Sequence, residues 1–406
     1  MITLKEAEIL KDVHSDIRGE LFIEALKMEK EGQKVLKLNT GNPGSFGFGM
    51  PDSIKNALVS NIDKSVPYCD YRGMLQAREA ICRFHNEGGI KKLTPDDIFI
   101  TNGVSEGVSM LTTAFINPGD EVLLPTPCYP LWSNCVKIAG GVPVYYKCDE
   151  EKDWNPSVGD IESKITSKTK AVLIINPNNP TGALYSEDIV KEIVEVAEKN
   201  NLVIFSDEIY DRLLYDGKVF TSTGKFAKED TVVVTTNGLS KSHSVCGFRC
   251  GWMAISGNEK AKAGLINGIM KIATMRLCSN AIMQLAIPEA LSDMEYPHSL
   301  TQPGGRLYQQ RKAVKEALAK AKHISAVTNM GAFYMFAKVD FKGKEVTDDR
   351  KFCMDLLHSK KILVMPGSCF NYETPDHFRI VMLPEEDIIG EAIEKIDDFF
   401  DEYINK

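Results

Sequence analysis

The segment Ala171-Val172-Leu173-Ile174-Ile175-Asn176-Pro177-Asn178-Asn179-Pro180-Thr181-Gly182 decides the fold class of this chain. Its first five residues are apolar and rich in β-branched side chains, which is typical of a strand buried on both faces of a parallel sheet. The next seven residues form a rigid loop that presents amide side chains where the strand ends. Turns use Asn, Pro and Gly, yet three Asn residues are more than a tight turn requires. The segment therefore predicts a buried parallel strand followed by a ligand-binding loop.

Strand and helix patterns alternate on both sides of this segment. Further strands are expected over residues 97–101, 121–125, 202–205 and 231–235, and Ser186 is expected to cap a helix. This alternation predicts an α/β fold with a layered sheet.

The chain length and a change of pattern predict two domains. A single core rarely grows past about 250–300 residues, and the chain has 406. After about residue 280 a long helical stretch, short strands and a closing helix replace the α/β alternation. We expect a large domain over 46–285 and a small C-terminal domain over 286–406. Residues 1–45 should pack with the small domain or reach toward a partner subunit.

Composition narrows the classes of partner. The formal net charge is −8 and no run of Lys or Arg forms a basic tail, so nucleic acid and anionic membranes are poor candidates. A small anionic ligand is not excluded, because a few Arg residues can override the net charge locally.

The ten cysteines are scattered without a disulfide framework or a zinc ligand pattern, which predicts buried thiols in a reducing cytoplasm and no bound metal. No stretch of about 20 apolar residues predicts a membrane span, and the N-terminus lacks the apolar core of a signal peptide.

An acidic residue follows the predicted strand over residues 202–205. Asp207 opens the stretch Asp207-Glu208-Ile209-Tyr210 just past this apolar run, so its carboxylate should be buried and should need a partner. A helix cap at a strand-to-helix turn is the ordinary interpretation. The functional interpretation is a counter-charge for a cationic ligand group, such as a protonated pyridine nitrogen.

A lysine follows the next predicted strand, in Gly238-Leu239-Ser240-Lys241. Burial lowers the pKa of a lysine and lets it attack a carbonyl, so we expect Lys241 to be a nucleophile with a lowered pKa. Eight residues later, Arg249 could clamp a phosphate with its planar guanidinium. A surface loop with solvated charges is the ordinary alternative.

The sequence Gly103-Val104-Ser105-Glu106 opens a helix, where backbone amides favour an anion. Gly103-x-Ser105-x-Gly107 also matches the nucleophile elbow of serine hydrolases. Asp207 and either His358 or His377 follow in the order Ser, Asp, His. A serine hydrolase that uses Ser105 is therefore an alternative, although it leaves the Asn-rich loop, Lys241 and Arg249 unexplained.

Together these motifs resemble the fold-type I, class I/II aminotransferases, which depend on pyridoxal 5′-phosphate. The order and spacing match in Asn176–Gly182, Ser206–Tyr210, Ser240-Lys241 with Gly247–Arg249, and His377–Ile380. Asp16–Gly19, Val35–Asn39, Met275–Cys278 and Pro303–Tyr308 are similar to the bacterial alanine (glutamate–pyruvate) aminotransferases in particular.

The resemblance implies a mainly parallel seven-stranded sheet flanked by helices, with a smaller α+β domain. It implies transfer of an amino group between a small L-amino acid, alanine first, and a 2-oxo acid such as pyruvate or 2-oxoglutarate, by a ping-pong mechanism. A C–S β-lyase of the same fold shares every cofactor residue and remains an alternative.

The resemblance also implies residue roles. Lys241 bonds the cofactor and later carries a proton, Asp207 keeps the pyridine nitrogen protonated, and Tyr210 contacts the ring hydroxyl; these three are the implied catalytic residues. The other implied cofactor contacts are Asn179 at the ring hydroxyl, Tyr129 on the ring face, and Val104, Ser105, Ser240 and Arg249 at the phosphate. Tyr68 would reach the phosphate from the neighbouring subunit, which implies a homodimer with shared sites.

For the substrate, the resemblance implies that Arg379 pairs with the α-carboxylate, helped by Gly41 and Asn179. Arg18 is available for a second carboxylate. Two stretches depart from the alanine aminotransferase pattern, which has Tyr where this chain has Ser15 and a basic residue near Ser244. Both are expected near the distal end of the substrate, so the choice of amino acid stays open.

Overall fold

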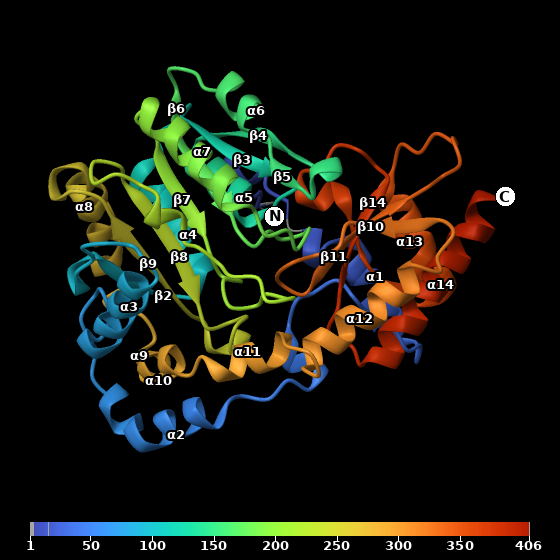
Figure 1. Ribbon diagram of the computed structural model, residues 1–406, viewed down its shortest axis with the longest axis horizontal. Coiled ribbons are helices and arrows are strands. Elements are labelled where there is room, and N and C mark those ends of the chain that lie inside the picture. The colour runs from blue at the N-terminus through green and yellow to red at the C-terminus, as the bar shows by residue number, and fades with distance from the viewer. Residues whose placement is uncertain (1–3, 15, 406) are drawn as a thin grey trace.

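The computed structural model describes residues 4–14 and 16–405. A large sheet with helices on both faces occupies one side of the molecule, and a smaller sheet with its own helices occupies the other (Figure 1). The long helix α12 (Arg306–Leu318) lies on the side of the smaller sheet, and α11 (Glu295–Thr301) precedes it beneath the large one.

The large sheet has the strand order β2-β9-β8-β7-β6-β3-β4-β5. The strands are β2 (Ile98–Asn102), β3 (Glu121–Thr126), β4 (Val142–Asp149), β5 (Asn155–Pro156), β6 (Thr169–Ile175), β7 (Val203–Asp207), β8 (Val233–Gly238) and β9 (Cys250–Ser256). Neighbouring strands from β8 through β4 run parallel, whereas β9 runs antiparallel between β2 and β8. The expected mainly parallel sheet is confirmed, with the two-residue antiparallel β5 added at one edge.

Strand β6 is buried on both faces, as its sequence predicts. Val172 and Ile174 pack into the hydrophobic cluster under α7 (Glu187–Lys199), and Leu173 packs into the opposite cluster under α4 (Val104–Phe115). The Ser186 side chain accepts a hydrogen bond from Ile189 N at 3.3 Å, so the predicted helix cap is present. The remaining helices around this sheet are α2 (Asp52–Asn61), α3 (Leu75–Glu87), α5 (Leu131–Ile138), α6 (Val158–Ser163), α8 (Glu259–Met275), α9 (Ala281–Gln284) and α10 (Ile287–Ser292).

The smaller sheet is antiparallel, in the order β10-β11-β14-β13. Its strands are β10 (Ile324–Ala326), β11 (Tyr334–Val339), β13 (Met365–Pro366) and β14 (His377–Val381), and its helices include α13 (Asp349–Lys360) and α14 (Glu386–Ile404). Near the N-terminus, α1 (Glu20–Lys30) contributes to the same hydrophobic cluster, and β1 (Leu36–Lys37) pairs with β12 (Ile362–Leu363). The domain boundaries at residues 45 and 285 stay a prediction.

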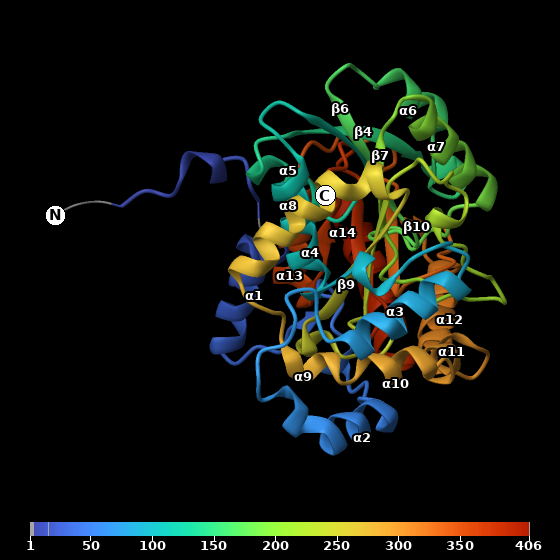
Figure 2. The same ribbon diagram turned by 90° about the vertical axis from the view of Figure 1, so that its left-hand side faces the viewer.

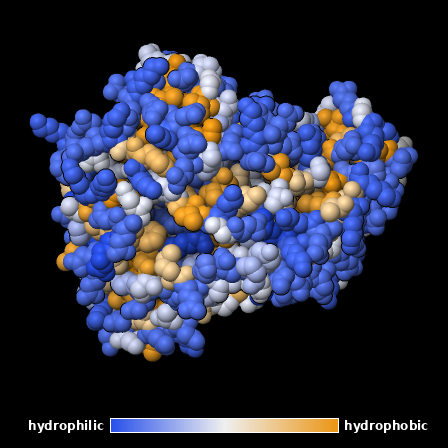
Figure 3. Space-filling view, in the orientation of Figure 1, coloured by the Kyte–Doolittle hydropathy of each residue, from blue (hydrophilic) through white to orange (hydrophobic). Residues whose placement is uncertain are grey.

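The face of the molecule shown in Figure 3 is mainly hydrophilic and is hollowed near its middle. The first described residues extend away from the body of the molecule (Figure 2), whereas Asp16, shortly before α1, forms an ion pair with Arg350 of α13. Among residues 4–14 and 16–405, no helix has the length and apolar character that crossing a bilayer requires.

Candidate active site

A cavity of about 540 Å³ lies where the carboxyl ends of the parallel strands face the smaller sheet. Such strand ends are the usual ligand-binding edge of an open α/β sheet. Twelve of the thirteen predicted site residues line this cavity: Arg18, Gly41, Val104, Ser105, Tyr129, Asn179, Asp207, Tyr210, Ser240, Lys241, Arg249 and Arg379. They come from segments that lie far apart in the sequence, so the topology brings them together.

The lining is strongly basic although the chain as a whole is acidic. Lys241, Arg18, Arg249 and Arg379 face the cavity, and Asp207 is the one carboxylate among its described lining residues. An excess of cations in a concave site attracts and retains anionic ligands. The cavity is therefore suited to molecules that carry carboxylate or phosphate groups.

Lys241 follows β8 and reaches the cavity half-buried, with its Nζ donating a hydrogen bond to the Gly41 carbonyl at 2.7 Å. Burial by itself lowers the pKa of Lys241, but its electrostatic interactions with Tyr334, Cys246 and Tyr129 outweigh burial, and the pKa is raised above its ordinary value. The expectation of a lowered pKa, drawn from burial alone, is wrong for this chain. Lys241 is consequently an ammonium group that the cavity holds in place until it reacts.

Asp207 ends β7 and is buried. Burial raises its pKa to about 6, against the hydrogen bonds from Trp132 and the Ile209 amide and the charge of Lys241, which all favour the carboxylate. Trp132 Nε1 donates to Asp207 Oδ2 at 2.9 Å, and its indole stacks on Phe205. The tryptophan therefore sets both the position and the charge of this acid.

The start of α4 and Arg249 form an anion cradle beside Lys241. Arg249 has a left-handed backbone (φ 54°), and its Nη1 donates to the Cys246 carbonyl at 2.9 Å. Gly103, also at positive φ, lies so close that a Cβ there would collide with the Arg249 guanidinium. The glycine lets a cation and the helix N-terminus, with its free amides at Val104 and Ser105, approach the same point.

Arg379, from β14, lies at the opposite side of the cavity and is buried. Its guanidinium is sandwiched between the rings of Tyr334 and Phe370, 4.6 Å from each ring centre. Nη1 donates to Asn179 Oδ1 at 2.9 Å and Nη2 donates to the Asn39 carbonyl, while Nε has no hydrogen-bond partner among the described residues. The planar cation is thus held rigidly and keeps unused donor capacity, as a carboxylate receptor requires.

The tyrosines at the cavity complete its polar lining. The Tyr210 and Tyr334 hydroxyls lie 2.7 Å apart, and burial raises the pKa of Tyr210 well above its usual value. Burial also raises the pKa of half-buried Tyr129. Their phenols therefore stay protonated and can donate hydrogen bonds.

Two predicted residues do not line this cavity, and a third is not described. Tyr68 is 80 % exposed and does not line the cavity of its own chain. Ser15 falls outside the described residues. Ser244 is buried at Tyr296, whose hydroxyl lies 3.2 Å from its Oγ, and it does not line the cavity. Its left-handed backbone (φ 59°) belongs to a turn against α11, and its place near the distal end of the substrate stays a prediction.

The hydrolase alternative fails on geometry. Ser105 lines the cavity, but no histidine among the described residues does. His377 is buried between Asp376 and Glu150 and stacks on Phe336, and His358 lies near Glu24. The order Ser, Asp, His in the sequence was a coincidence, since the topology places neither histidine near Ser105.

Sequence reasoning assigned no role to two aromatic residues of this site. Trp132 follows the predicted site residue Tyr129 by three positions, so its position carried a signal. Tyr334 begins a strand without an unusual pattern, so its position carried no signal. It contacts Arg379, and a Cβ at Gly41 would collide with it. Among the described residues no group of three or more His, Cys, Asp or Glu is placed to hold a metal ion.

Comparisons with known proteins agree with this arrangement. The profile of the family described as aminotransferase class I and II matches residues 33–396. The glutamate-pyruvate aminotransferase AlaA of Haemophilus influenzae is 46% identical over 398 residues, 98% of each chain, and the alanine aminotransferase of Mycobacterium tuberculosis is 42% identical over 97% of this chain and 92% of its own.

Solved structures show the same fold. An aminotransferase from Escherichia coli superposes with a TM-score of 0.96 at 44% identity, covering 98% of this chain and 99% of its own. The alanine aminotransferase of Pyrococcus furiosus superposes with a TM-score of 0.92 at 35% identity, over 98% of this chain and 100% of its own.

Proposed function

The chain belongs to the class I and II aminotransferase family, and from that premise we propose that it transfers an amino group between a small L-amino acid, alanine first, and a 2-oxo acid, with pyridoxal 5′-phosphate as cofactor. One observation carries the proposal. A lysine, a buried acid, an anion cradle and a rigid arginine line a single cavity.

The charges of the cavity residues fit pyridoxal 5′-phosphate, and each polar group of the cofactor has a suitable partner among them. Asp207 suits the pyridine nitrogen, because a buried carboxylate needs a cationic partner. Ser240, Arg249 and the amides at Val104 and Ser105 suit the phosphate, and Gly103 keeps their cradle open. Tyr210 and Asn179 offer side-chain donors for the ring hydroxyl, and Tyr129 offers an aromatic face.

When bound, the cofactor supplies an aldehyde for covalent bonding and a ring that accepts electrons. The chain supplies the rest. Lys241 Nζ would hold the aldehyde carbon and would carry the proton that leaves or joins the substrate Cα. The carboxylate of Asp207 would keep the ring nitrogen protonated. Arg379, with Asn179 and the Gly41 backbone, orients the α-carboxylate of the substrate.

The choice of substrate rests on the relatives and on Arg18. The full-length relatives named above are glutamate-pyruvate and alanine aminotransferases. An enzyme that alternates between alanine and glutamate must accept a short side chain and a second carboxylate at one place. Arg18 is an exposed cation in the lining and forms no ion pair with another described residue, and we assign it to the distal carboxylate of glutamate or 2-oxoglutarate.

We propose further that the enzyme is a cytoplasmic homodimer with shared active sites. Tyr68, Val66 and Met275 are apolar or aromatic side chains that lie largely exposed. Gln284 of α9 donates a hydrogen bond to Cys69 Sγ at 3.4 Å. The segment around Tyr68 and the helical region after α8 therefore lie next to each other on the surface. In the dimer Tyr68 would complete the phosphate cradle of the partner. Sedimentation equilibrium tests this, and a mass of one 45.1 kDa chain would reject it.

A panel of amino donors tests the activity itself. Holoenzyme prepared with pyridoxal 5′-phosphate should absorb in the visible range and should convert L-alanine with 2-oxoglutarate to pyruvate and glutamate, faster than it uses other donors. Release of ammonia and pyruvate without any 2-oxo acid would instead indicate the C–S β-lyase, an alternative that the relatives give no support. A colourless protein after incubation with the cofactor would contradict the proposal.

Replacing Trp132 with phenylalanine should shift the pH dependence of catalysis. Activity requires the Asp207 carboxylate, so it falls as the pH drops through the pKa of this acid, which burial raises and a bound pyridinium nitrogen would lower. Trp132→Phe removes a hydrogen bond that favours the carboxylate, and the pKa should rise by about one unit. The acid limb of kcat/KM against pH should therefore move upward, whereas Trp154→Phe, a buried tryptophan outside the cavity, should leave it in place. An unmoved acid limb would separate Trp132 from the charge of Asp207.

A further inference from the structure

Asn371 links the smaller sheet to the large sheet beside the candidate active site. It follows the short 3₁₀-helix Gly367–Phe370, and its backbone is left-handed (φ 57°). Its side-chain oxygen accepts a hydrogen bond from the Tyr145 hydroxyl of β4 at 2.9 Å, and its carbonyl accepts one from Thr126 Oγ1 of β3 at 2.5 Å. Its side-chain nitrogen donates to Ser133 Oγ of α5 at 3.4 Å. Three elements on the side of the large sheet therefore hold one residue of the segment between β13 and β14.

Asparagine suits this position for two physical reasons. It tolerates a left-handed backbone better than most residues, and its amide offers an acceptor and two donors on one short side chain. Burial raises the pKa of Tyr145 and the pKa of Cys128 to about 12, so the hydroxyl and the thiol keep their protons. The Tyr145 hydroxyl therefore donates to Asn371, and the amide of Asn371 also donates to the neutral Cys128 sulfur at 3.6 Å. Aspartate would lack the donors, and glycine would lack the whole side chain.

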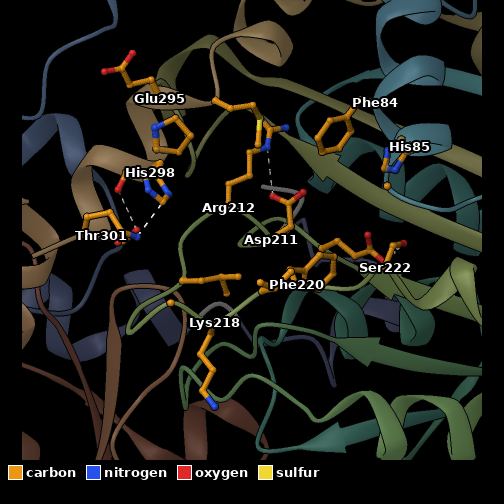
Figure 4. Close-up of a pocket in the computed structure, with 18 residues that line it drawn as sticks. Phe84, His85, Asp211, Arg212, Lys218, Phe220, Ser222, Glu295, His298 and Thr301 are labelled. Atoms are coloured by element: carbon orange, nitrogen blue, oxygen red, sulfur yellow. Dashed lines mark hydrogen bonds and ion pairs between the residues drawn. The ribbon is translucent and has the colours of Figure 1, made fainter.

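The residues next to this link reach both sides of the active-site cavity. The Phe370 carbonyl accepts a hydrogen bond from the Cys128 amide at 2.9 Å. The guanidinium of Arg379 lies 4.6 Å from the centre of the Phe370 ring, and Cys128 immediately precedes Tyr129, which lines the cavity. Phe370, Asn371 and Cys128 themselves line neither this cavity nor the separate cavity of about 730 Å³ that α3 and α11 help to line (Figure 4). They can therefore affect a ligand through Arg379 and Tyr129 but not by touching it.

We propose that Asn371 is a positioning residue for the substrate carboxylate. By joining the two sheets it holds Arg379 and Tyr129 at a fixed separation, so that the receptor for the α-carboxylate is formed before the substrate arrives. This role presupposes the function proposed for the active-site cavity. Without the side chain of Asn371, the two sides of the cavity can take other relative positions, and only the fraction of molecules in the aligned position binds substrate. The affinity for every carboxylate ligand of this cavity should then fall by that fraction.

Replacing Asn371 with glycine in the holoenzyme tests this role, because glycine keeps the left-handed backbone and removes only the side chain. The KM values for alanine and 2-oxoglutarate should rise about tenfold, the order expected for one or two lost hydrogen bonds. The value of kcat should change less than about twofold, because Lys241 and Asp207 both belong to strand ends of the large sheet and keep their positions. Calorimetric titration with glutarate, a dicarboxylate that cannot exchange an amino group, should show the same loss of affinity.

Two further variants show whether the effect comes from this link. Tyr145→Phe removes a single hydrogen bond to Asn371 and should weaken binding about threefold. Combining it with Asn371→Gly should add little, since both changes remove the same contact. Asn201→Gly, at an exposed asparagine that is also left-handed (φ 55°), is the matched control and should behave as wild type.

Asn371 has no positioning role if its folded glycine variant keeps the wild-type KM values and glutarate affinity. A lower melting temperature with unchanged KM would likewise overturn the proposal, because the link would then serve stability alone. If circular dichroism shows that the variant does not fold, Tyr145→Phe decides, and unchanged affinity there would reject the role. A wild-type enzyme that transfers no amino group would contradict the proposed function itself, whereas an active wild type beside an unaffected variant rejects only the role of Asn371.

Discussion

Lys241→Ala is expected to lower kcat for amino-group transfer by about 10⁴-fold or more, because proton transfer by a positioned base alone contributes up to that factor. The side chain reaches the cavity from β8 and is anchored at the Gly41 carbonyl, 2.7 Å away. No other lysine among the described residues lines this cavity. Nothing in the lining can therefore take over its bond to the aldehyde or its proton.

Stopped-assay rates for alanine with 2-oxoglutarate, together with absorption spectra, measure this effect. The variant should still bind pyridoxal 5′-phosphate through the anion cradle but should lack the spectrum of the lysine-bound cofactor. Lys320→Ala removes an exposed lysine and should retain wild-type turnover. A Lys241→Ala enzyme with normal turnover would remove this residue from the mechanism.

Arg379→Leu is expected to cost about 2–5 kcal/mol in kcat/KM, the usual effect of truncating one partner of a buried charge pair. The wild-type guanidinium is held between Tyr334 and Phe370 and by Asn179, so its position is set before the substrate arrives. Leucine retains an apolar side chain between the two rings but cannot accept the charge of a carboxylate. The loss should appear for every amino acid and 2-oxo acid, since all carry the α-carboxylate.

Initial rates over a range of alanine and 2-oxoglutarate concentrations measure the loss in kcat/KM. Arg83→Leu, at an exposed arginine of α3, serves as the matched control and should behave as wild type. Equal kcat/KM in the Arg379 variant would place the carboxylate elsewhere. A loss confined to dicarboxylic substrates would assign Arg379 to the distal end instead of the α-carboxylate.

Much of the site could be predicted because its residues stand next to strong local patterns. The apolar run of β6 predicts a strand buried on both faces, and hydrophobic clusters on the two faces now account for it. Polar loops that follow such strands must lie at one edge of a parallel sheet. For this reason Asn179, Asp207 and Lys241 were expected together, and they line one cavity.

Contacts between segments far apart in the sequence could not be predicted in this way. Tyr334 lies against Arg379 and Tyr210 only because β11 pairs with β14 across from the large sheet. Tyr334 also contributes to the raised pKa of Lys241, which burial alone would have lowered. The hydrolase alternative shows that a familiar order in the chain does not ensure proximity. Ser105 and His377 match the order of a serine hydrolase but do not share a cavity.

By itself the sequence determined the α/β class, the strand-end loops and the chemical groups they carry, because hydrophobic periodicity and turn residues act over a few neighbouring positions. Only the tertiary structure decided which charges meet and which acid Trp132 supports. Those outcomes depend on the packing of distant segments, and electrostatic energy depends on distance and burial that no local pattern encodes.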